Sequence, residues 1–116
     1  MVIQDINLNL IPTGTPIVVH VNQNDRGSYR LRIFLKLNGE RYIWTNGSTF
    51  KLRGTKPNGE TFEKSCGYIG VEYLQVNLDT DIDGVSGDVY CNVEMTEGDD
   101  RTGTQAFILR VQKEAK

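Results

Sequence analysis

Hydrophobic and polar residues alternate with a period of two along most of the chain. The alternation is longest at residues 28–37, "SYRLRIFLKL". One side of this segment is apolar and consists of Tyr29, Leu31, Ile33, Leu35 and Leu37. The other side carries Arg30, Arg32, Phe34 and Lys36. Successive side chains of a strand point to opposite faces, so the pattern predicts a long strand with one face in a core and the other face outside.

Turn signals divide the rest of the chain into further short strands. Asn38-Gly39 is a dipeptide favoured in two-residue hairpin turns, and "KPNGE" at residues 56–60 places proline and glycine where a tight turn needs them. Strand patterns occupy residues 6–10, 17–23, 40–44, 48–54, 61–69, 71–78, 87–95 and 104–112, and no segment has a convincing helical period. Eight or nine short strands at this spacing predict an all-β domain, an antiparallel sandwich or barrel. We favour the β-sandwich.

The length and composition fit one domain. The chain has 116 residues, 38% of them apolar, and a net charge of -2. A soluble globular domain has this balance, whereas a disordered acidic tail or a protein that binds nucleic acid through its overall charge does not. We expect residues 1–112 to form the domain. Residues 113–116, "KEAK", are expected to be a polar tail that begins a linker to further C-terminal parts.

The amino terminus does not have the pattern of a secretory signal. It carries Asp5 and several asparagines where a signal peptide has a basic start and an unbroken apolar run. No later segment is apolar enough for long enough to cross a bilayer. We therefore expect no membrane partner and a chain that stays in the cytosol.

The stretch "LDTDIDGVSGD" at residues 78–88 begins like a calcium loop. Its acidic residues are Asp79, Asp81, Asp83 and, further on, Asp88. The twelfth position counted from Asp79 is Tyr90, where such a loop needs a bidentate glutamate, and strand patterns flank it instead of helices. The sequence therefore predicts a solvated turn without metal, and a looser calcium cage built from the same carboxylates is the alternative.

The residues needed for catalysis are scarce. His20 is the only histidine, and Cys66 and Cys91 are the only cysteines, far apart and without a CxxC pattern. A zinc or redox site needs closer ligands, and acid–base or nucleophilic catalysis needs a base held beside a nucleophile. We expect two buried thiols, no catalytic residue, no cofactor and no enzymatic activity. A pocket joining His20 to a carboxylate or to a cysteine would be required for the opposite conclusion.

A basic row with one aromatic residue is the candidate binding surface. It consists of Arg30, Arg32, Phe34 and Lys36, with Arg41 across the predicted hairpin. Charged side chains outside and aliphatic ones inside are ordinary for an antiparallel strand, so a solvated face is one interpretation. An exposed aromatic side chain between cations is more typical of a protein interface, so partner binding is the other.

A carbohydrate-binding module is an alternative function on the same kind of fold. Sugar binding uses aromatic rings presented for stacking, and the candidates are Tyr42, Trp44 and Tyr73. Sandwich folds host both functions, so the fold alone does not choose between them. An exposed platform of rings would favour sugar binding, and buried rings would favour a docking module.

The order of the segments resembles the N-terminal domain of baseplate upper proteins from tailed phages of Gram-positive bacteria. The likeness runs through "QNDRGSYRLRIFL", "GSTFKLRGTKPNGETF", "VNLDTDIDGVSGDVYCNVEM" and the closing "AFILRV", and so covers nearly the whole chain. Its most specific parts are the turn at residues 24–28, the turn at residues 54–59, and Gly87, which opens the strand toward Tyr90.

The resemblance implies an immunoglobulin-like sandwich in the virion. Such a domain would attach a peripheral protein to the tail or baseplate core, with other tail proteins such as the distal tail protein as partners. It would work as a homo-oligomer in the full-length assembly, built in the host cytoplasm. The resemblance supplies no catalytic or contact residues, and it places the acidic stretch in a connection before a late strand.

Overall fold

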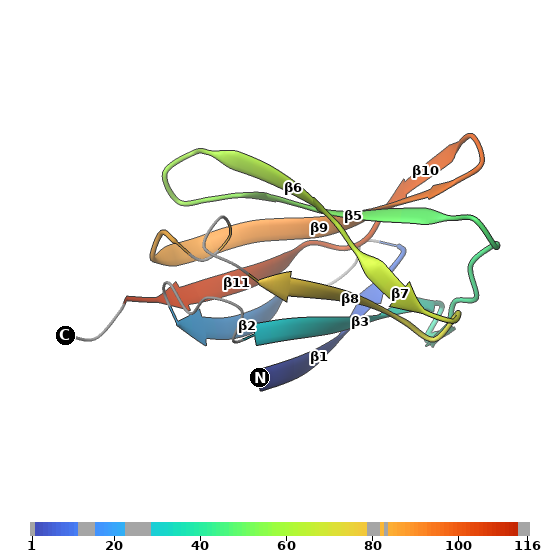
Figure 1. Ribbon diagram of the computed structural model, residues 1–116, viewed down its shortest axis with the longest axis horizontal. Helices are drawn as coiled ribbons and strands as arrows, with labels where there is room; N and C mark the ends of the chain where they lie inside the picture. Colours follow the sequence, from blue (N-terminus) through green and yellow to red (C-terminus); the bar gives the residue numbers. More distant parts are fainter. Residues whose placement is uncertain (1, 12–15, 23–28, 79–81, 83, 114–116) are drawn as a thin grey trace.

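The computed structural model describes residues 2–11, 16–22, 29–78, 82 and 84–113. It is built of strands that form two sheets packed face to face (Figure 1). The strands are β1 (Val2–Asn9), β2 (Ile17–Asn22), β3 (Tyr29–Leu37), β4 (Glu40–Arg41), β5 (Thr49–Thr55), β6 (Thr61–Ser65), β7 (Gly67–Ile69), β8 (Tyr73–Leu78), β9 (Gly87–Glu97), β10 (Asp100–Gly103) and β11 (Phe107–Gln112). Within the described ranges, no helix is long and apolar enough to cross a membrane.

The predicted all-β sandwich is confirmed, with more strands than the eight or nine expected. One sheet has five strands in the order β1-β3-β8-β7, with β4 beside β3. The other has six strands in the order β2-β11-β9-β5-β6, with β10 beside β9. The additional strands are β10, which forms a short hairpin with β9, and the one gained because residues 61–69 form two strands instead of one. The immunoglobulin-like topology stays a prediction.

Two strand pairs are parallel, whereas the sequence predicted antiparallel pairing. β1 lies parallel to β3, and β2 lies parallel to β11. A parallel pair needs a crossover connection, and β2 of the opposite sheet lies between β1 and β3 in the chain. Alternation of side chains fixes which face of a strand is buried but not the direction of its neighbour, which is why the sequence missed these pairs.

The chain passes from one sheet to the other at Cys66. β6 is an edge of the six-stranded sheet and β7 an edge of the five-stranded sheet, and Figure 1 shows them following each other across the same side of the sandwich. The backbone N–H of Cys66 donates to the carbonyl oxygen of Phe50 at 3.0 Å. The peptide chain at Cys66 thus joins an edge strand of one sheet directly to an edge strand of the other.

The core consists of the inward residues of both sheets. β3 contributes Leu31, Ile33 and Leu35, all fully buried, and β9 contributes Val89 and Val93 in the same way. The predicted hairpin at residues 38–39 is also present, since Asn38 and Gly39 have φ values of 53° and 83°. Positive values at both positions are what a two-residue turn requires to match the strand twist.

A polar clasp holds the end of β1 to the six-stranded sheet. Gln105 is only 6% exposed. Its backbone N–H donates to the carbonyl of Asn9 at 2.8 Å, and its side-chain Oε1 accepts from the N–H of Asn9 at 2.8 Å. The neighbouring Thr104 exchanges two hydrogen bonds with the backbone of Val93. The clasp satisfies buried polar groups that would otherwise be costly.

Gln105→Met tests the clasp, because methionine keeps the length of the side chain but cannot accept from the Asn9 N–H. Leaving a partly buried donor unpaired should lower the free energy of unfolding by about 1–3 kcal/mol. Gln112→Met, at the exposed end of β11, is the control and should change stability little. Urea titration measures both, and equal losses would show that the clasp does not stabilise the fold.

Gly54→Ala tests the packing of β6 on β5. A Cβ atom at Gly54 would lie 2.6 Å from the Phe62 ring and 3.0 Å from the backbone oxygen of Tyr90. Such overpacking should cost about 1–3 kcal/mol of unfolding free energy. Gly67→Ala is the matched control, because its nearest neighbour would be the Cγ atom of Gln75 at 3.7 Å. Thermal or urea unfolding that ranks the two variants equally would contradict the packing.

Candidate functional site

The four residues singled out in the sequence lie together on the outer face of the five-stranded sheet. Arg30, Arg32, Phe34 and Lys36 alternate with the buried residues of β3. The strand register places residues of β1 and β8 on either side of them. We call this surface the basic face, and it consists of Ile3, Asp5, Asn7, Arg30, Arg32, Phe34, Lys36, Arg41, Ile69, Tyr73, Gln75 and Asn77.

Two of its cations are held by neighbours in the sheet. The Arg32 guanidinium donates to both carboxylate oxygens of Asp5, at 2.6 and 2.7 Å. The hydrogen bond from Arg32 lowers the pKa of Asp5 below its ordinary value. Arg30 donates from Nε to the side-chain oxygen of Asn77 at 2.9 Å. These contacts fix the direction of both guanidinium groups, although exposed pairs of this kind stabilise a fold only slightly.

Aromatic and aliphatic side chains lie beside the cations. The rings of Phe34 and Tyr73 have centroids 5.4 Å apart, and the Arg32 guanidinium carbon lies 5.3 Å from the Tyr73 ring centroid. Ile69 is paired with Tyr73 in the sheet and is 44% exposed. Ile43 is 62% exposed and borders this face, because the Tyr42 N–H donates to the Leu35 carbonyl oxygen at 2.9 Å and so continues the β3–β4 pairing beyond Arg41. The face thus combines positive charge with accessible apolar surface.

A small hollow adjoins this face where β8 meets the chain crossing. It has a volume of about 250 Å³ and is lined by Arg30, Lys64, Ser65, Gly67, Gln75, Val76 and Asn77. Lys64 reaches it from β6 and donates from Nζ to the carbonyl oxygen of Asn77 at 2.7 Å. The hollow therefore contains two cationic groups and side-chain amides. Sequence reasoning missed Lys64 and Gln75, because the sheet crossing at Cys66 brings Lys64 beside Arg30 and the pairing of β3 with β8 brings Gln75 there.

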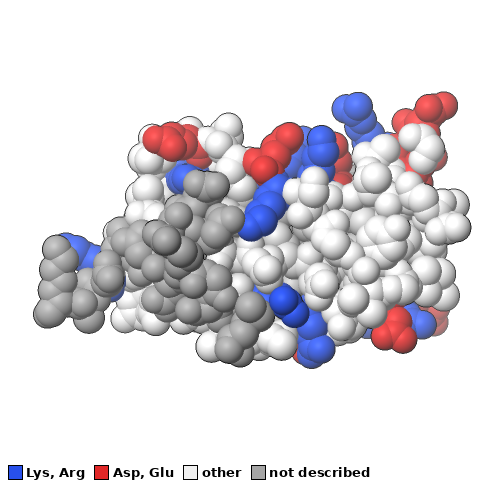
Figure 2. Space-filling view, in the orientation of Figure 1, with Lys and Arg blue, Asp and Glu red and all other residues white. Residues whose placement is uncertain are grey.

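The surface at the β7 end of the molecule is largely uncharged. Figure 2 shows few charged side chains in the right-hand half of the view, over the place where Figure 1 draws β7, with charges along the rims. Tyr68, Ile69 and Val71 are exposed apolar residues of this segment. Ile69 of the basic face therefore has exposed apolar neighbours in the sequence, which are Tyr68 and Val71.

The three rings considered for sugar binding do not share one exposed surface. Trp44 is 4% exposed and packs edge-on against Phe50, with ring centroids 5.0 Å apart. Tyr42 is partly buried and donates its hydroxyl to Glu97 at 2.6 Å. Tyr73 lies on the basic face against Phe34. This arrangement does not support the aromatic platform that a carbohydrate module would need.

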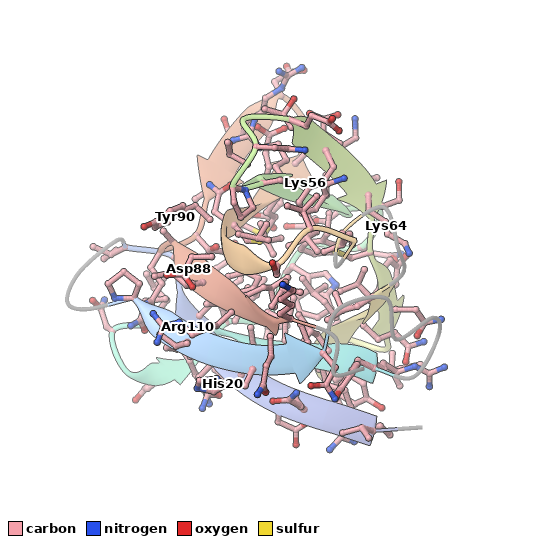
Figure 3. The ribbon with its side chains drawn as sticks, turned by 90° about the vertical axis from the view of Figure 1, so that its left-hand side faces the viewer. His20, Lys56, Lys64, Asp88, Tyr90 and Arg110 are labelled. Atoms are coloured by element: carbon pink, nitrogen blue, oxygen red, sulfur yellow. The ribbon has the colours of Figure 1, made fainter. Side chains whose placement is uncertain are left out.

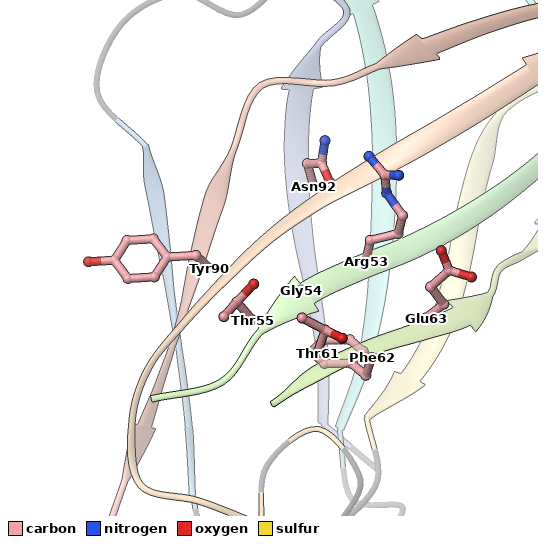
Figure 4. Close-up of a pocket in the computed structure, with 8 residues that line it drawn as sticks. All are labelled: Arg53, Gly54, Thr55, Thr61, Phe62, Glu63, Tyr90 and Asn92. Atoms are coloured by element: carbon pink, nitrogen blue, oxygen red, sulfur yellow. The ribbon is translucent and has the colours of Figure 1, made fainter. Parts of the chain in front are cut away.

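A second hollow lies on the six-stranded sheet, with a volume of about 460 Å³. Its lining residues are Arg53, Gly54, Thr55, Thr61, Phe62, Glu63, Tyr90 and Asn92. Figure 4 shows the Tyr90 ring pointing away from the other lining residues. Arg53 is paired with Glu94, at 2.9 Å. The hollow is shallow and polar, and its only guanidinium is already engaged.

His20 and the cysteines occupy different parts of the fold. His20 is exposed on β2, opposite Arg110 in the strand register, and Arg110 donates to both oxygens of Asp88 at 2.9 and 3.2 Å. Figure 3 shows Tyr90, Asp88 and Arg110 along one side of the six-stranded sheet, with His20 nearby. Cys91 is buried between the sheets and so points away from His20.

The two thiols are free, and one of them is less buried than expected. Cys91 is buried, but Cys66 is only partly buried because it lies at the crossing between the sheets. Burial raises the pKa of Cys66 to about 11 and that of Cys91 to about 12. Both thiols are therefore protonated near neutral pH, and a thiol is a poor nucleophile in that form.

The candidate calcium residues Asp79, Asp81 and Asp83 lie outside the described residues. Asp88, considered as a further ligand, is engaged with Arg110, whose hydrogen bonds lower the pKa of this carboxylate. Among the residues that the structure describes, no group of three or more His, Cys, Asp or Glu side chains could hold a metal ion.

The fold is shared with a solved structure described as the N-terminal domain of phage TP901-1 ORF48. The two structures superpose with a TM-score of 0.77, over 97% of this chain and 100% of that chain, and 17% of the residues are identical. No family model matches this chain. No curated protein matches it either. At this level of identity the likeness shows a common fold.

Glu97 is the last residue of β9, at the end of the strand away from Tyr90. It connects β9 to the segment at residues 42–45. It accepts from the Tyr42 hydroxyl at 2.6 Å and from the backbone N–H of Thr45 at 2.9 Å. The bond from Tyr42, followed by that from Thr45, holds the pKa of Glu97 below its ordinary value of 4.5. The same bond raises the pKa of Tyr42. The contact fixes the chain that leads from β4 to Trp44.

Tyr42→Phe removes this hydrogen bond and should lower the free energy of unfolding by about 0.5–1 kcal/mol near neutral pH, after allowance for solvent screening. A carboxylate with a lowered pKa stabilises the fold above its unfolded pKa and loses this effect as the pH falls through the folded pKa. The deficit of the variant should therefore be present above pH 4.5 and shrink below it.

Urea titrations of wild type and variant across this range measure the effect. Tyr90→Phe is the matched control, since Tyr90 is 59% exposed on the outer face of the six-stranded sheet. A deficit for Tyr42→Phe that does not change between neutral and acidic pH would exclude Glu97 as the partner that matters.

Proposed function

We propose that this chain is a structural, non-catalytic component of a phage virion. In this proposal it is the N-terminal domain that docks a peripheral baseplate or tail protein onto the tail core. The observation that carries the proposal is the likeness of fold, end to end, to the N-terminal domain of a phage protein. The resemblance of the sequence to baseplate upper proteins supports the same role independently.

The arrangement of side chains agrees with a docking module. Exposed apolar residues such as Ile3 and Ile69 lie on the same sheet face as the oriented cations, which is the kind of surface that protein interfaces use. The thiols are protonated, and the histidine lies on a different face from the buried cysteine. The partner in this proposal is another tail or baseplate protein such as the distal tail protein. The full-length protein would act there as a homo-oligomer.

Light scattering of the purified chain, alone and mixed with the distal tail protein of the same virion, tests this function. We expect the mixture to show a species whose mass is the sum of the two partners in a whole-number ratio. Repeating the mixture with calcium and with a chelator tests whether the acidic stretch at residues 79–83 takes part. Two separate species at concentrations well above the micromolar range would contradict the proposal.

A further inference from the structure

We propose that the basic face binds an acidic segment of the protein partner, one that carries carboxylates next to apolar side chains. This inference rests on the proposed docking function and specifies its surface and the chemistry of the partner. The lines of evidence are the sign of the charge on this face, the apolar residues beside it, and the adjoining hollow.

Positive charge is concentrated on this face although the whole chain is slightly acidic. The outward positions of β1, β3, β4 and β8 in the described residues carry one carboxylate, Asp5, and four cations, which are Arg30, Arg32, Lys36 and Arg41. Asp5 is already paired with Arg32. Glu40 pairs with Leu37 and so belongs to the other side of β4. With a net charge of -2 for the chain, the excess of cations here is local.

Two of these cations are available to a partner. Lys36 and Arg41 lie directly opposite each other in the β3–β4 pair, so their side chains emerge side by side. Within the part of the chain that the structure describes, neither forms an ion pair. Two like charges at one point of a sheet repel each other, and a partner carboxylate would relieve that repulsion.

The apolar residues give the site anchors that need little ordering. Phe34 and Tyr73 hold each other in a tilted contact, and Arg32 lies over Tyr73. Ile43 and Ile69 extend this apolar surface and are exposed. Rigid aromatic residues with neighbouring cations are the usual centres of binding energy in protein interfaces. A partner with only negative charges, such as a phosphate backbone, would leave this surface unused.

The hollow lined by Arg30, Lys64 and Gln75 provides a pocket for one side chain of the partner. Its volume of about 250 Å³ is suited to a single acidic side chain and not to an extended ligand. Arg30 is already directed by Asn77, so it is in place before binding. The pocket thus adds a specific position for a carboxylate beside the apolar anchors.

A second copy of the chain is a poor occupant for this face in a two-fold arrangement. A two-fold interface brings the same patch of both copies together. Both patches would then carry the same excess of cations, and the Asp5 carboxylate of each copy is already used by Arg32. The charge pattern therefore favours a different protein with an acidic surface.

Binding of the full chain to the distal tail protein of the same virion, measured by calorimetry or surface-based kinetics, tests the inference. Lys36→Glu combined with Arg41→Glu should weaken binding at least about tenfold, and raising the salt concentration should weaken wild-type binding. The matched control is Lys51→Glu with Arg101→Glu, on exposed positions of the six-stranded sheet and its hairpin. This control should change the affinity less than about twofold.

The apolar part has its own pair of variants. Ile43→Ser should weaken binding about tenfold, because Ile43 is 62% exposed beside the basic face and supplies apolar area to the contact. Ile108→Ser, on the outer face of the six-stranded sheet, is the control and should have little effect. Circular dichroism and urea unfolding verify that each variant is folded before its binding is compared.

The outcomes separate the inference from the proposed function. Absence of wild-type binding would overturn both. Wild-type binding that survives the variants of the basic face, or is lost with the control variants, would overturn the inference alone. A doubled mass of the chain without partner, abolished by the Lys36 and Arg41 reversals, would assign the face to a second copy. Retention on host cell-wall polysaccharide that is lost with Tyr73→Ala would assign it to a carbohydrate.

Discussion

The packing of two inner sheet faces against each other is the constraint on which the rest of this structure depends. Every strand that contributes to the core must turn alternate residues inward, so the remaining residues form two separate outer faces. Leu31, Ile33 and Leu35 are fully buried for this reason, and Arg30, Arg32 and Phe34 between them are held outside. The candidate binding surface is thus a direct consequence of how the core is filled.

The two outer faces differ in the balance of their charges. On the six-stranded sheet, Arg53 and Arg110 are each paired with a carboxylate of β9, so the charges there compensate one another. On the five-stranded sheet the cations outnumber the carboxylates, and apolar side chains lie beside them. A face with uncompensated charge and accessible apolar area has more to gain from a partner than a face whose ion pairs are complete.

The sides of the sandwich are held by contacts between residues far apart in the sequence. The chain crosses between the sheets at Cys66 on one side, and Gln105 clasps the end of β1 with two hydrogen bonds. Glu97 fixes the segment that leads to Trp44 in a similar way. These contacts anchor the segments near the exposed face to the opposite sheet.

The sequence by itself determined the sandwich class, the faces of β3, the turn at residues 38–39, and the turn at residues 56–60, where the Gly59 N–H donates to the Lys56 carbonyl oxygen at 2.9 Å. Local physics is sufficient for these features, because strand alternation and the positive φ of turn residues depend on near neighbours. Only the tertiary structure decided the parallel pairs, the crossing at Cys66, and the meeting of Arg30 with Lys64 and Gln75. Alternation indicates which face of a strand is buried but not which strand lies beside it. A binding surface is formed by side chains of several adjacent strands, so it depends on that second piece of information.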